Sequence, residues 1–302
     1  MFQSFAEIIA AARLHERVKI AVAAAADADV LEAVAAAKQA GIADAVLVGD
    51  TVAIKELCHQ ENIDCDLFEL EQAPDVRVAA KRAAELVRNG SAQVLMKGLV
   101  GTADFMRAVL NKTEGLGTGG LLSHVVVFEA ADYNRLMLLT DAAINIAPDL
   151  PQKVQIIENA LRVTSALGNR NPRVAMLAAV ETVTASMKAT EDAALIAKMA
   201  ERGQIKGCRI DGPLALDNAV SPTAAKHKGI GGEVAGNADL LVVPNIEAGN
   251  VLYKALVYFA KAPLAGIVIG AAAPVVLTSR ADSPQTKVNS IALAVVSSMV
   301  ER

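Results

Sequence analysis

Residues 266–283 read GIVIGAAAPVVLTSRADS, an apolar run that ends in a hydroxyl beside a cation. Residues 266–277 predict a buried strand, and Thr278, Ser279 and Arg280 follow where that strand stops. Open α/β folds bind ligands at the carboxyl edge of the sheet, and the planar fork of arginine suits a tetrahedral oxyanion. A lone Ser-Arg pair more often belongs to a capped surface helix than to a catalytic site. Whether this pair indicates a catalytic site therefore depends on the other segments of the chain.

Short apolar runs alternate with periodic helical segments along most of the sequence. This pattern predicts parallel strands with helices on both faces, and therefore an α/β fold. Strands are expected at residues 18–22, 44–48, 92–96, 173–178, 208–211 and 239–243.

The middle of the chain departs from the alternation. Residues 121–128 and 135–139 are two apolar runs joined by a short polar segment, which predicts an antiparallel hairpin. The hairpin indicates a second domain inserted in the first. We therefore expect one discontinuous domain of residues 1–116 plus 261–302 and another of residues 117–260.

Composition excludes several classes of protein. The chain has 302 residues with a net charge of −4, 3% aromatic residues and no tryptophan, which leaves no nucleic-acid footprint. Three cysteines without CxxC spacing argue against a disulfide framework and a structural zinc site. The longest apolar run, residues 262–277, is interrupted by glycines and prolines and is shorter than the roughly 20 residues of a membrane span. We expect a soluble, cytoplasmic protein that binds neither nucleic acid nor membrane.

Residues 115–120, GLGTGG, match a dinucleotide-binding motif by letter. That motif requires a strand before it and a helix after it. Here a helical segment precedes it and an apolar strand follows, so the segment is predicted to be a loop between elements.

Residues 97–107, KGLVGTADFMR, form a more promising site. A strand ends just before Lys97, and Thr102 opens a helix that carries Arg107. Free N–H groups at a helix N-terminus bind anions. Taken alone, the segment is better explained as an ordinary capped helix with a solvated Arg107.

Polar residues follow three further strands of the predicted sheet. Turn and capping roles explain each of them as well as a ligand site does, and no spacing specifies a metal centre. Because all lie where strands stop, they favour one cleft built from several loops. After the first of these strands lie Asp141 and Asn145. After the second lie Asp211 and Asn218, on either side of a Gly-Pro turn, and after the third lie Glu247 and Asn250.

Taken together, these segments resemble the phosphate acetyl/butyryltransferase family over nearly the whole chain, and its butyryl branch most closely. The resemblance is carried by KGLVGTADFMRAVLNK, LLSHVVVFE, LLTDAAINIAPDL, RGQIKGCRIDGPLALDNAVS, HKGIGG, NIEAGNVLYKALVYFA and LTSRADS. It implies a two-domain fold like that of isocitrate and isopropylmalate dehydrogenases, with the active site in the interdomain cleft and a homodimer or higher oligomer.

The resemblance also implies a reaction, in which acyl-CoA and phosphate exchange to acyl phosphate and free CoA. Coenzyme A and phosphate are substrates, and neither a cofactor nor a metal is required. Transfer is direct within a ternary complex, with butyryl preferred to acetyl.

Three residues match the family by position, namely Arg107, Ser279 and Arg280. We expect Arg280 and Arg107 to bind phosphate oxygens, with Thr102 and the helix N-terminus in support, and Ser279 to donate to the developing oxyanion. Lys97 and Thr278 are further candidates for binding phosphate or substrate.

Two positions depart from the family pattern. Thr286 stands where the acetyl branch has its proposed aspartate base, so Asp282 is the substitute. Gly117 stands where butyryl-type enzymes usually have an arginine.

Three alternatives stay open from the residues alone. The first is acetyl preference within the same reaction. The second is a metal- and NAD(P)-dependent decarboxylating dehydrogenase, which needs an aspartate cluster and a nucleotide loop. The third is a weakly catalytic CoA-binding or regulatory protein.

Overall fold

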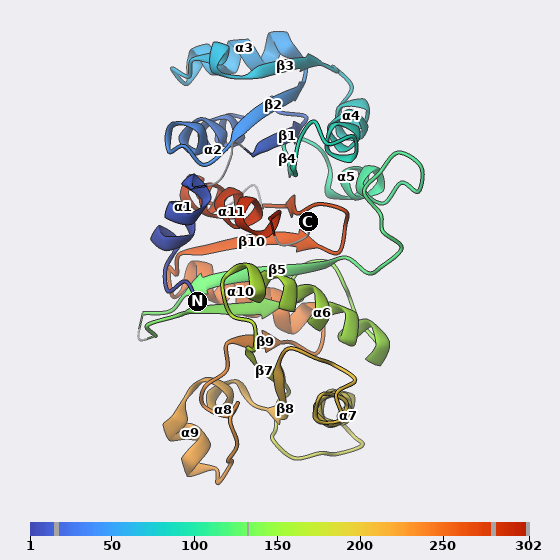
Figure 1. Cartoon of the computed structure of the whole chain (residues 1–302), viewed down its shortest axis with the longest axis vertical. Coiled ribbons are helices and arrows are strands. Elements are labelled where there is room, and N and C mark those ends of the chain that lie inside the picture. The colour runs from blue at the N-terminus through green and yellow to red at the C-terminus, as the bar shows by residue number, and fades with distance from the viewer. Residues whose placement is uncertain (15–17, 132, 279–281, 300–302) are drawn as a thin grey trace. The chain divides into compact units, whose positions relative to one another are not determined.

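The computed structural model describes residues 1–14, 18–131, 133–278 and 282–299. The chain divides into two compact units, each α/β. Unit 1 contains Met1–Ser4 and Leu121–Pro263, and unit 2 contains Phe5–Gly120 and Leu264–Arg302. Figure 1 shows the labelled elements of both. Among the described residues, no helix combines the length and apolar character needed to cross a bilayer.

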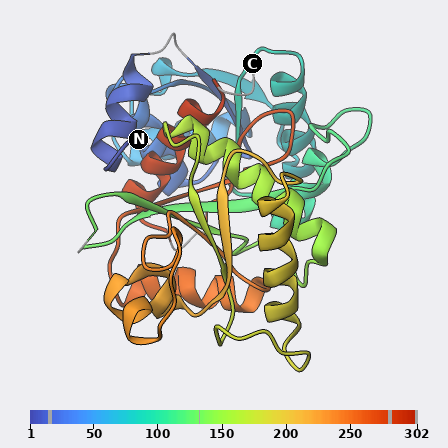
Figure 2. The ribbon, with the colours of Figure 1, turned by 60° about the horizontal axis from the view of Figure 1, so that its bottom comes forward.

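Unit 2 is a mostly parallel sheet with strand order β3-β2-β1-β4-β11-β10. Its strands are β1 (Lys19–Ala23), β2 (Asp44–Gly49), β3 (Glu69–Gln72), β4 (Val94–Lys97), β10 (Leu264–Ile269) and β11 (Val275–Val276). Its helices are α1 (Phe5–Arg13), α2 (Ala28–Gln39), α3 (Thr51–Gln60), the short 3₁₀ helix η1 (Cys65–Leu67), α4 (Val76–Arg88), α5 (Thr102–Val109) and α11 (Pro284–Ser297). In Figure 2 the red α11 lies beside the blue α1, and α11 packs against α1, α2 and β10.

Aspartates define where several helices of unit 2 begin. Asp27, Asp50 and Asp75 each accept backbone N–H groups from the first turn of α2, α3 and α4. A carboxylate in this position satisfies donors that the helix cannot and complements the helix dipole. These three helices therefore begin where the sequence supplies an aspartate.

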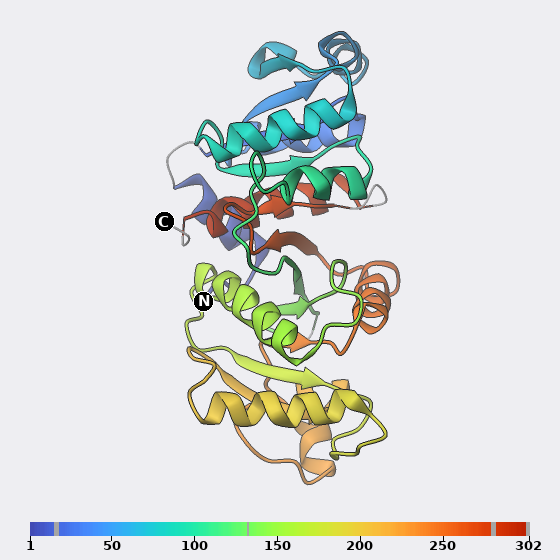
Figure 3. The same ribbon diagram turned by 90° about the vertical axis from the view of Figure 1, so that its right-hand side faces the viewer.

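Unit 1 has strand order β5-β6-β9-β7-β8. Its elements are β5 (Ser123–Glu129), β6 (Leu136–Thr140), α6 (Leu150–Ala166), β7 (Arg173–Leu177), α7 (Lys188–Glu201), β8 (Arg209–Leu214), α8 (Leu216–Val220), α9 (Pro222–His227), β9 (Leu240–Val242) and α10 (Ile246–Tyr258). The predicted hairpin is confirmed, since β5 and β6 pair antiparallel with Val126 opposite Leu139. The remaining pairs in unit 1 are parallel, and α6 and α10 cover opposite faces of its sheet (Figures 1 and 3).

Two predicted features are wrong in detail. The run at residues 266–277 is two strands, because the chain turns at Gly270, where φ is +103°, and β11 returns antiparallel to β10. The Gly-Pro turn expected after Asp211 lies inside β8, which extends to Leu214. Its sheet partner β7 explains this, because the pairing resumes at Leu177 and Leu214 after an irregularity in the register.

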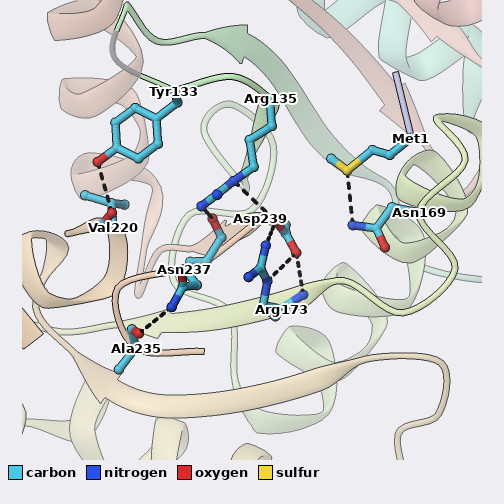
Figure 4. Close-up of polar contacts among 10 residues, drawn as sticks. Met1, Tyr133, Arg135, Asn169, Arg173, Val220, Ala235, Asn237 and Asp239 are labelled. Carbon is cyan, nitrogen blue, oxygen red and sulfur yellow. Dashed lines mark hydrogen bonds and ion pairs between the residues drawn. The ribbon is translucent and has the colours of Figure 1, made fainter. Parts of the chain in front are cut away.

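A buried ionic cluster ties the amino ends of three strands in unit 1 (Figure 4). Asp239, 3% exposed, accepts hydrogen bonds from the Arg173 side chain at 3.0 and 2.8 Å and from its backbone N–H at 2.9 Å. Arg135 lies 3.4 Å from the same carboxylate and donates to the Ala238 carbonyl at 3.1 Å. The bond to Asp239 raises the pKa of Arg173. Because the charges are paired and hydrogen-bonded, burial of this carboxylate is tolerated.

Candidate active site

The carboxyl ends of β4 and β11 in unit 2 lie side by side. The two strands pair parallel, with Met96 opposite Val276, so Lys97 and the residues after β11 leave the sheet at the same edge. Thr278 is half-buried at this edge. Ser279 and Arg280 lie outside the described residues. For Thr278, the expected position after a strand at the carboxyl edge agrees with this register.

The turn after β4 is held against the end of β1. The Gly98 N–H donates to the Ala23 carbonyl at 2.8 Å, and the Leu99 N–H donates to the Ala24 carbonyl at 2.7 Å. A Cβ on Gly98 would lie 2.4 Å from the Ala24 oxygen, so only glycine fits. Lys97 is buried, and its Nζ donates to the Gly98 carbonyl at 3.2 Å.

Helix α5 begins at Thr102, as predicted, with Gly101 as its N-cap residue. No side chain caps this end, and Thr102 is exposed. The first backbone N–H groups of a helix have no acceptor within the helix. They therefore form a positive end available to an anion.

Two arginines share one carboxylate beside this helix start. Arg107 donates to Oδ1 of Asp104, and Arg77 donates through Nε to Oδ2 of Asp104 at 3.2 Å. The Arg107 hydrogen bond lowers the pKa of Asp104, and the charge of Arg77 adds to the effect. The Arg77 and Arg107 side chains are 71% and 70% exposed, so two solvent-accessible cations are held by one anion.

Arg77 was missed by the sequence analysis. It lies in the first turn of α4, and it reaches Asp104 only because α4 and α5 pack together. No local pattern around residue 77 indicates a partner in another helix. The sequence around Arg107, by contrast, follows a strand end and a glycine-rich turn, which is a recognisable signal.

Asp282 lies just before α11, whose N-cap is Ser283. Asp282 is buried, and its carbonyl accepts a hydrogen bond from Lys287 Nζ at 2.7 Å. Lys287 also pairs with Asp29 of α2 at 3.3 Å. Ser283 Oγ caps α11 by accepting from the Thr286 N–H at 3.2 Å, and the hydroxyls of the two residues lie 3.0 Å apart.

The polar strand ends of unit 1 contain local turn contacts. Asp141 is buried, and its carboxylate accepts from the backbone of Ala143 and Ile144 at 2.8 and 3.0 Å and from the Asn145 amide at 2.6 Å. Asn145 also donates to the Leu122 carbonyl at 2.8 Å. These bonds fix the turn after β6, which is the capping role that the sequence also allowed.

Asp211 and Asn218 are not brought into one cluster by any direct bond. Asp211 Oδ1 accepts from the Gly212 N–H at 2.8 Å and lines a cavity of 510 Å³ between α7 and β8. Asn218 is fully buried and donates to Glu181 at 3.3 Å.

Glu247 and Asn250 lie on the first turns of α10 and are exposed. The Asn250 amide donates to the Ala142 carbonyl at 3.3 Å. Between them, Gly249 is buried, and a Cβ there would lie 2.5 Å from the Asp141 carbonyl. In the parts of the chain that the structure describes, no group of three or more His, Cys, Asp or Glu side chains could hold a metal ion.

Comparisons with known proteins cover nearly the whole chain. The family described as phosphate acetyl/butaryl transferase matches residues 4–78 and 70–295. A phosphate butyryltransferase of Clostridium acetobutylicum is 53% identical over 97% of this chain and 98% of its own length. The chain belongs to the phosphate acetyl/butyryltransferase family.

Other relatives agree with this family, and solved structures agree with the fold. A phosphate acetyltransferase of Thermotoga maritima is 46% identical over 92% of this chain and 94% of its own length. A branched-chain phosphotransacylase structure from Enterococcus faecalis superimposes with a TM-score of 0.83 at 33% identity, covering 93% and 99% of the two chains. A 4-hydroxythreonine-4-phosphate dehydrogenase from Klebsiella pneumoniae shares the fold at a TM-score of 0.58 and 13% identity, covering 95% and 100%. The expected dehydrogenase-like α/β fold is confirmed.

The candidate site residues divide between the two units. Lys97, Thr102, Arg107, Thr278 and Asp282 all belong to unit 2. Within that set the structure shows an uncapped helix start at Thr102 and, in the last turn of the same helix, Arg107 bonded to Asp104. Asp141, Asn145, Asp211, Asn218, Glu247 and Asn250 belong to unit 1, where Asp141 and Asn145 contact each other.

Proposed function

We propose that this protein is a phosphate acyltransferase that moves a short acyl group, butyryl ahead of acetyl, between coenzyme A and inorganic phosphate. The observation that carries the proposal is the 53% identity to a phosphate butyryltransferase over 97% of this chain. The uncapped start of α5 and the two arginines bonded to Asp104 support it, because the reaction needs a place for a dianion. Acetyl preference is the second candidate, because a phosphate acetyltransferase is 46% identical over 92% of the chain.

In the proposed reaction a phosphate oxygen attacks the thioester carbonyl, the C–O bond forms and the C–S bond breaks. The thiolate of CoA leaves and takes a proton. In reverse, the thiolate attacks the acyl phosphate and phosphate leaves. Both directions pass through a tetrahedral oxyanion, so donors aimed at that oxygen and at phosphate lower the barrier.

Arg107 is the described residue proposed to bind phosphate. Asp104 orients its guanidinium from within the same helix, and the uncapped N–H groups at Thr102 lie at the start of that helix. Charge-assisted bonds of this kind are the strong class of hydrogen bond. Arg280 is proposed as the second phosphate ligand and Ser279 as the oxyanion donor, on the family resemblance alone.

Lys97, Thr278 and Asp282 are proposed to have supporting roles. Lys97 and Thr278 lie at the strand edge where the substrate is expected, and Asp282 is the proposed base. The Lys287 bond to the Asp282 carbonyl supports a fixed position for that residue.

Domain division and compartment complete the proposal. We propose that residues 1–116 with 261–302 and residues 117–260 act as the two domains, which the two compact units support. We propose action in the cytoplasm, which the free thiols of Cys58, Cys65 and Cys208 support.

The test follows free thiol released from acetyl-CoA, butyryl-CoA and longer acyl-CoAs, with and without phosphate and with and without EDTA. The proposal expects release that requires phosphate, survives chelation and is fastest with butyryl-CoA. Fastest release with acetyl-CoA would select the second candidate, and no phosphate-dependent release would overturn both.

Variants connect the activity to the named residues. Arg107→Gln is expected to reduce kcat/KM for phosphate about 100-fold, as loss of a transition-state donor does, and Arg280→Ala by a similar factor. Arg202→Gln, at the exposed end of α7, is the matched control and should behave as wild type. Wild-type kinetics in Arg107→Gln would remove that residue from the proposed site.

A further inference from the structure

Two cysteine side chains of unit 2 contact each other. Cys58 lies in the last turn of α3, and Cys65 is the first residue of η1. The two thiols share a hydrogen bond, and both are free thiols rather than a disulfide. Cys58 is fully buried, whereas Cys65 is partly exposed. The pair therefore combines a thiol that solvent cannot reach with one that it can.

The turn between α3 and η1 holds the two cysteines in this position. The chain reverses at Asn62, whose φ is +55°, and the Ile63 N–H donates to the Cys58 carbonyl at 2.8 Å. The Cys65 carbonyl accepts from the Phe68 N–H at 3.2 Å. Because the backbone of each cysteine is hydrogen-bonded, the contact between the sulfurs follows from the fold of the turn.

This contact places the sulfurs near the position that a disulfide needs. A disulfide has its two sulfurs about 2.05 Å apart, and it forms without strain only where the two backbones already lie close together. Two thiols that share a hydrogen bond need only small side-chain rotations to close that distance. The geometry of the turn therefore favours a bond between them.

We propose that Cys58 and Cys65 form a reversible disulfide by exchange with a low-molecular-weight disulfide, such as oxidised glutathione. The Cys65 thiolate attacks one sulfur of the small disulfide, and a mixed disulfide forms as one small thiol leaves with the proton that Cys65 lost. The Cys58 sulfur then attacks the Cys65 sulfur, and the second small thiol leaves with the Cys58 proton. Two protein thiols are oxidised while one small disulfide is reduced to two thiols.

The order of the two attacks follows from accessibility. Cys65 can meet a reagent in solution, whereas Cys58 cannot. Burial raises the pKa of Cys58 to about 12, and the hydrogen bond to Cys65 and the charge of its thiolate add to the effect. The mixed disulfide removes these last two contributions, because Cys65 then has neither a thiol proton nor a charge. The Cys58 thiol therefore loses its proton more readily in the second step than in the resting protein.

The disulfide would fix the edge of the unit 2 sheet. Helix η1 is followed by β3, which stands at the end of the strand order and pairs with β2. Figure 1 shows α3 beside β3, and the two elements are in contact. In a reducing compartment, such as the cytoplasm proposed above, the thiols stay reduced at rest. A rise in small disulfides would join α3 to the segment that leads into β3, which makes this edge sensitive to redox conditions.

Peptide mapping of the full native chain tests the bond. The protein is equilibrated with mixtures of reduced and oxidised glutathione, quenched with acid, alkylated and digested. Trypsin cuts after Lys55 and after Arg77, so one peptide carries both cysteines and the disulfide appears as the loss of two hydrogens without alkylation. We expect this form to replace the dithiol as the oxidised fraction rises, while Cys208 forms at most a mixed disulfide. Persistence of two alkylated cysteines, or of a mixed disulfide at Cys65, in fully oxidised glutathione overturns the proposal.

The same titration in urea separates the effect of the fold from mere closeness in sequence. We expect the effective concentration of the two thiols to be at least about tenfold higher in the native protein than in urea. An equal or lower native value would show that the fold does not favour the bond, and the proposal would be wrong. Amide hydrogen exchange in β3 should also slow on oxidation, and unchanged exchange would contradict the stiffening of this edge.

Two variants test the order of attack. Cys58→Ala should accumulate the mixed disulfide at Cys65, because the second attack is lost. Cys65→Ser should leave Cys58 unmodified in the native state, because burial shields it. Circular dichroism confirms that both variants are folded, and rapid modification of Cys58 in Cys65→Ser would overturn the order. Because each readout is a covalent state or an exchange rate, these tests are independent of the proposed acyl transfer.

Discussion

Arg77 donates through Nε to Oδ2 of Asp104 at 3.2 Å, although the two residues lie on different helices. Asp104 also holds Arg107 within its own helix, so one carboxylate positions two guanidinium groups. One of the two positive charges is left without an equivalent negative charge in this cluster. The excess charge is what an incoming phosphate dianion would meet.

Arg77→Gln should weaken phosphate binding while leaving the chemical step nearly intact. Removing an exposed cation near the proposed phosphate position costs about 1 kcal/mol, which is about fivefold in KM for phosphate. Steady-state kinetics with phosphate as the varied substrate measures this, and Arg202→Gln again serves as control. A fall in kcat as large as that of Arg107→Gln would show that Arg77 acts on the transition state instead.

Asp192→Asn should destabilise unit 1 strongly. Asp192 is 2% exposed and bonds Lys153 and Lys188, each at 2.7 Å, and Lys153 is itself buried. Without the carboxylate, Lys153 becomes an uncompensated buried cation, which costs about 3–5 kcal/mol. Urea unfolding measures the change in the free energy of unfolding. Glu201→Gln, which breaks the exposed Lys198 pair on the same helix, should change it little.

The same carboxylate makes stability depend on pH. Burial raises the pKa of Asp192, but the hydrogen bonds and the positive charges of Lys153 and Lys188 together lower it by more, so it lies below its ordinary value. A depressed folded-state pKa stabilises the fold above the unfolded-state pKa and loses that contribution as pH falls through the folded-state value. Wild-type unfolding free energy should therefore drop below about pH 4, and in Asp192→Asn this part of the drop should be absent.

Thiol reagents should label Cys58 and Cys208 slowly in the native protein. Burial raises the pKa of Cys58 to about 12 and that of Cys208 to about 11, so neither is a thiolate near neutral pH. The thiolate is the reactive form. Near pH 8 both should react slowly in the native state and quickly in urea, as followed by mass spectrometry of alkylated peptides. Rapid native labelling of Cys58 would contradict its full burial on α3.

Gly98→Ala should disrupt the turn after β4. The added Cβ would lie 2.4 Å from the Ala24 carbonyl oxygen, which already accepts the Leu99 N–H, so the turn must move. Forced overpacking of this kind costs about 1–3 kcal/mol, and phosphate-dependent turnover should fall because Lys97 and α5 are displaced together. Gly231→Ala has open space around its Cβ and is the control for stability. Equal melting temperatures for the two variants would show that the turn adapts.

The sequence predicted those parts of the fold that depend on local patterns. Asp27 and Asp75 mark helix starts because capping is a local interaction, and the hairpin of β5 and β6 follows from two adjacent apolar runs. Strand β3 was missed, since Glu69–Gln72 is a partly exposed edge strand without an apolar run.

The residues of the candidate site likewise include some that local sequence predicts and one that it does not. Thr102 and Arg107 are recognisable because they follow a strand end, whereas Arg77 joins them only through contact between two helices. The strand at residues 266–277 appeared continuous because every residue in it is apolar or glycine or proline. Only the pairing of Val268 with Val275 shows that the chain turns back.

The discontinuous composition of unit 2 has a consequence for how the protein is made. A ribosome produces α1 through α5 first, yet their partners β10, β11 and α11 emerge only after all of unit 1. Until then β4 lacks its neighbour β11, and the apolar faces of α1 and α2 lack α11. The half of the protein that is translated earliest is therefore completed last. During that interval its open sheet edge is the surface that a chaperone would need to protect.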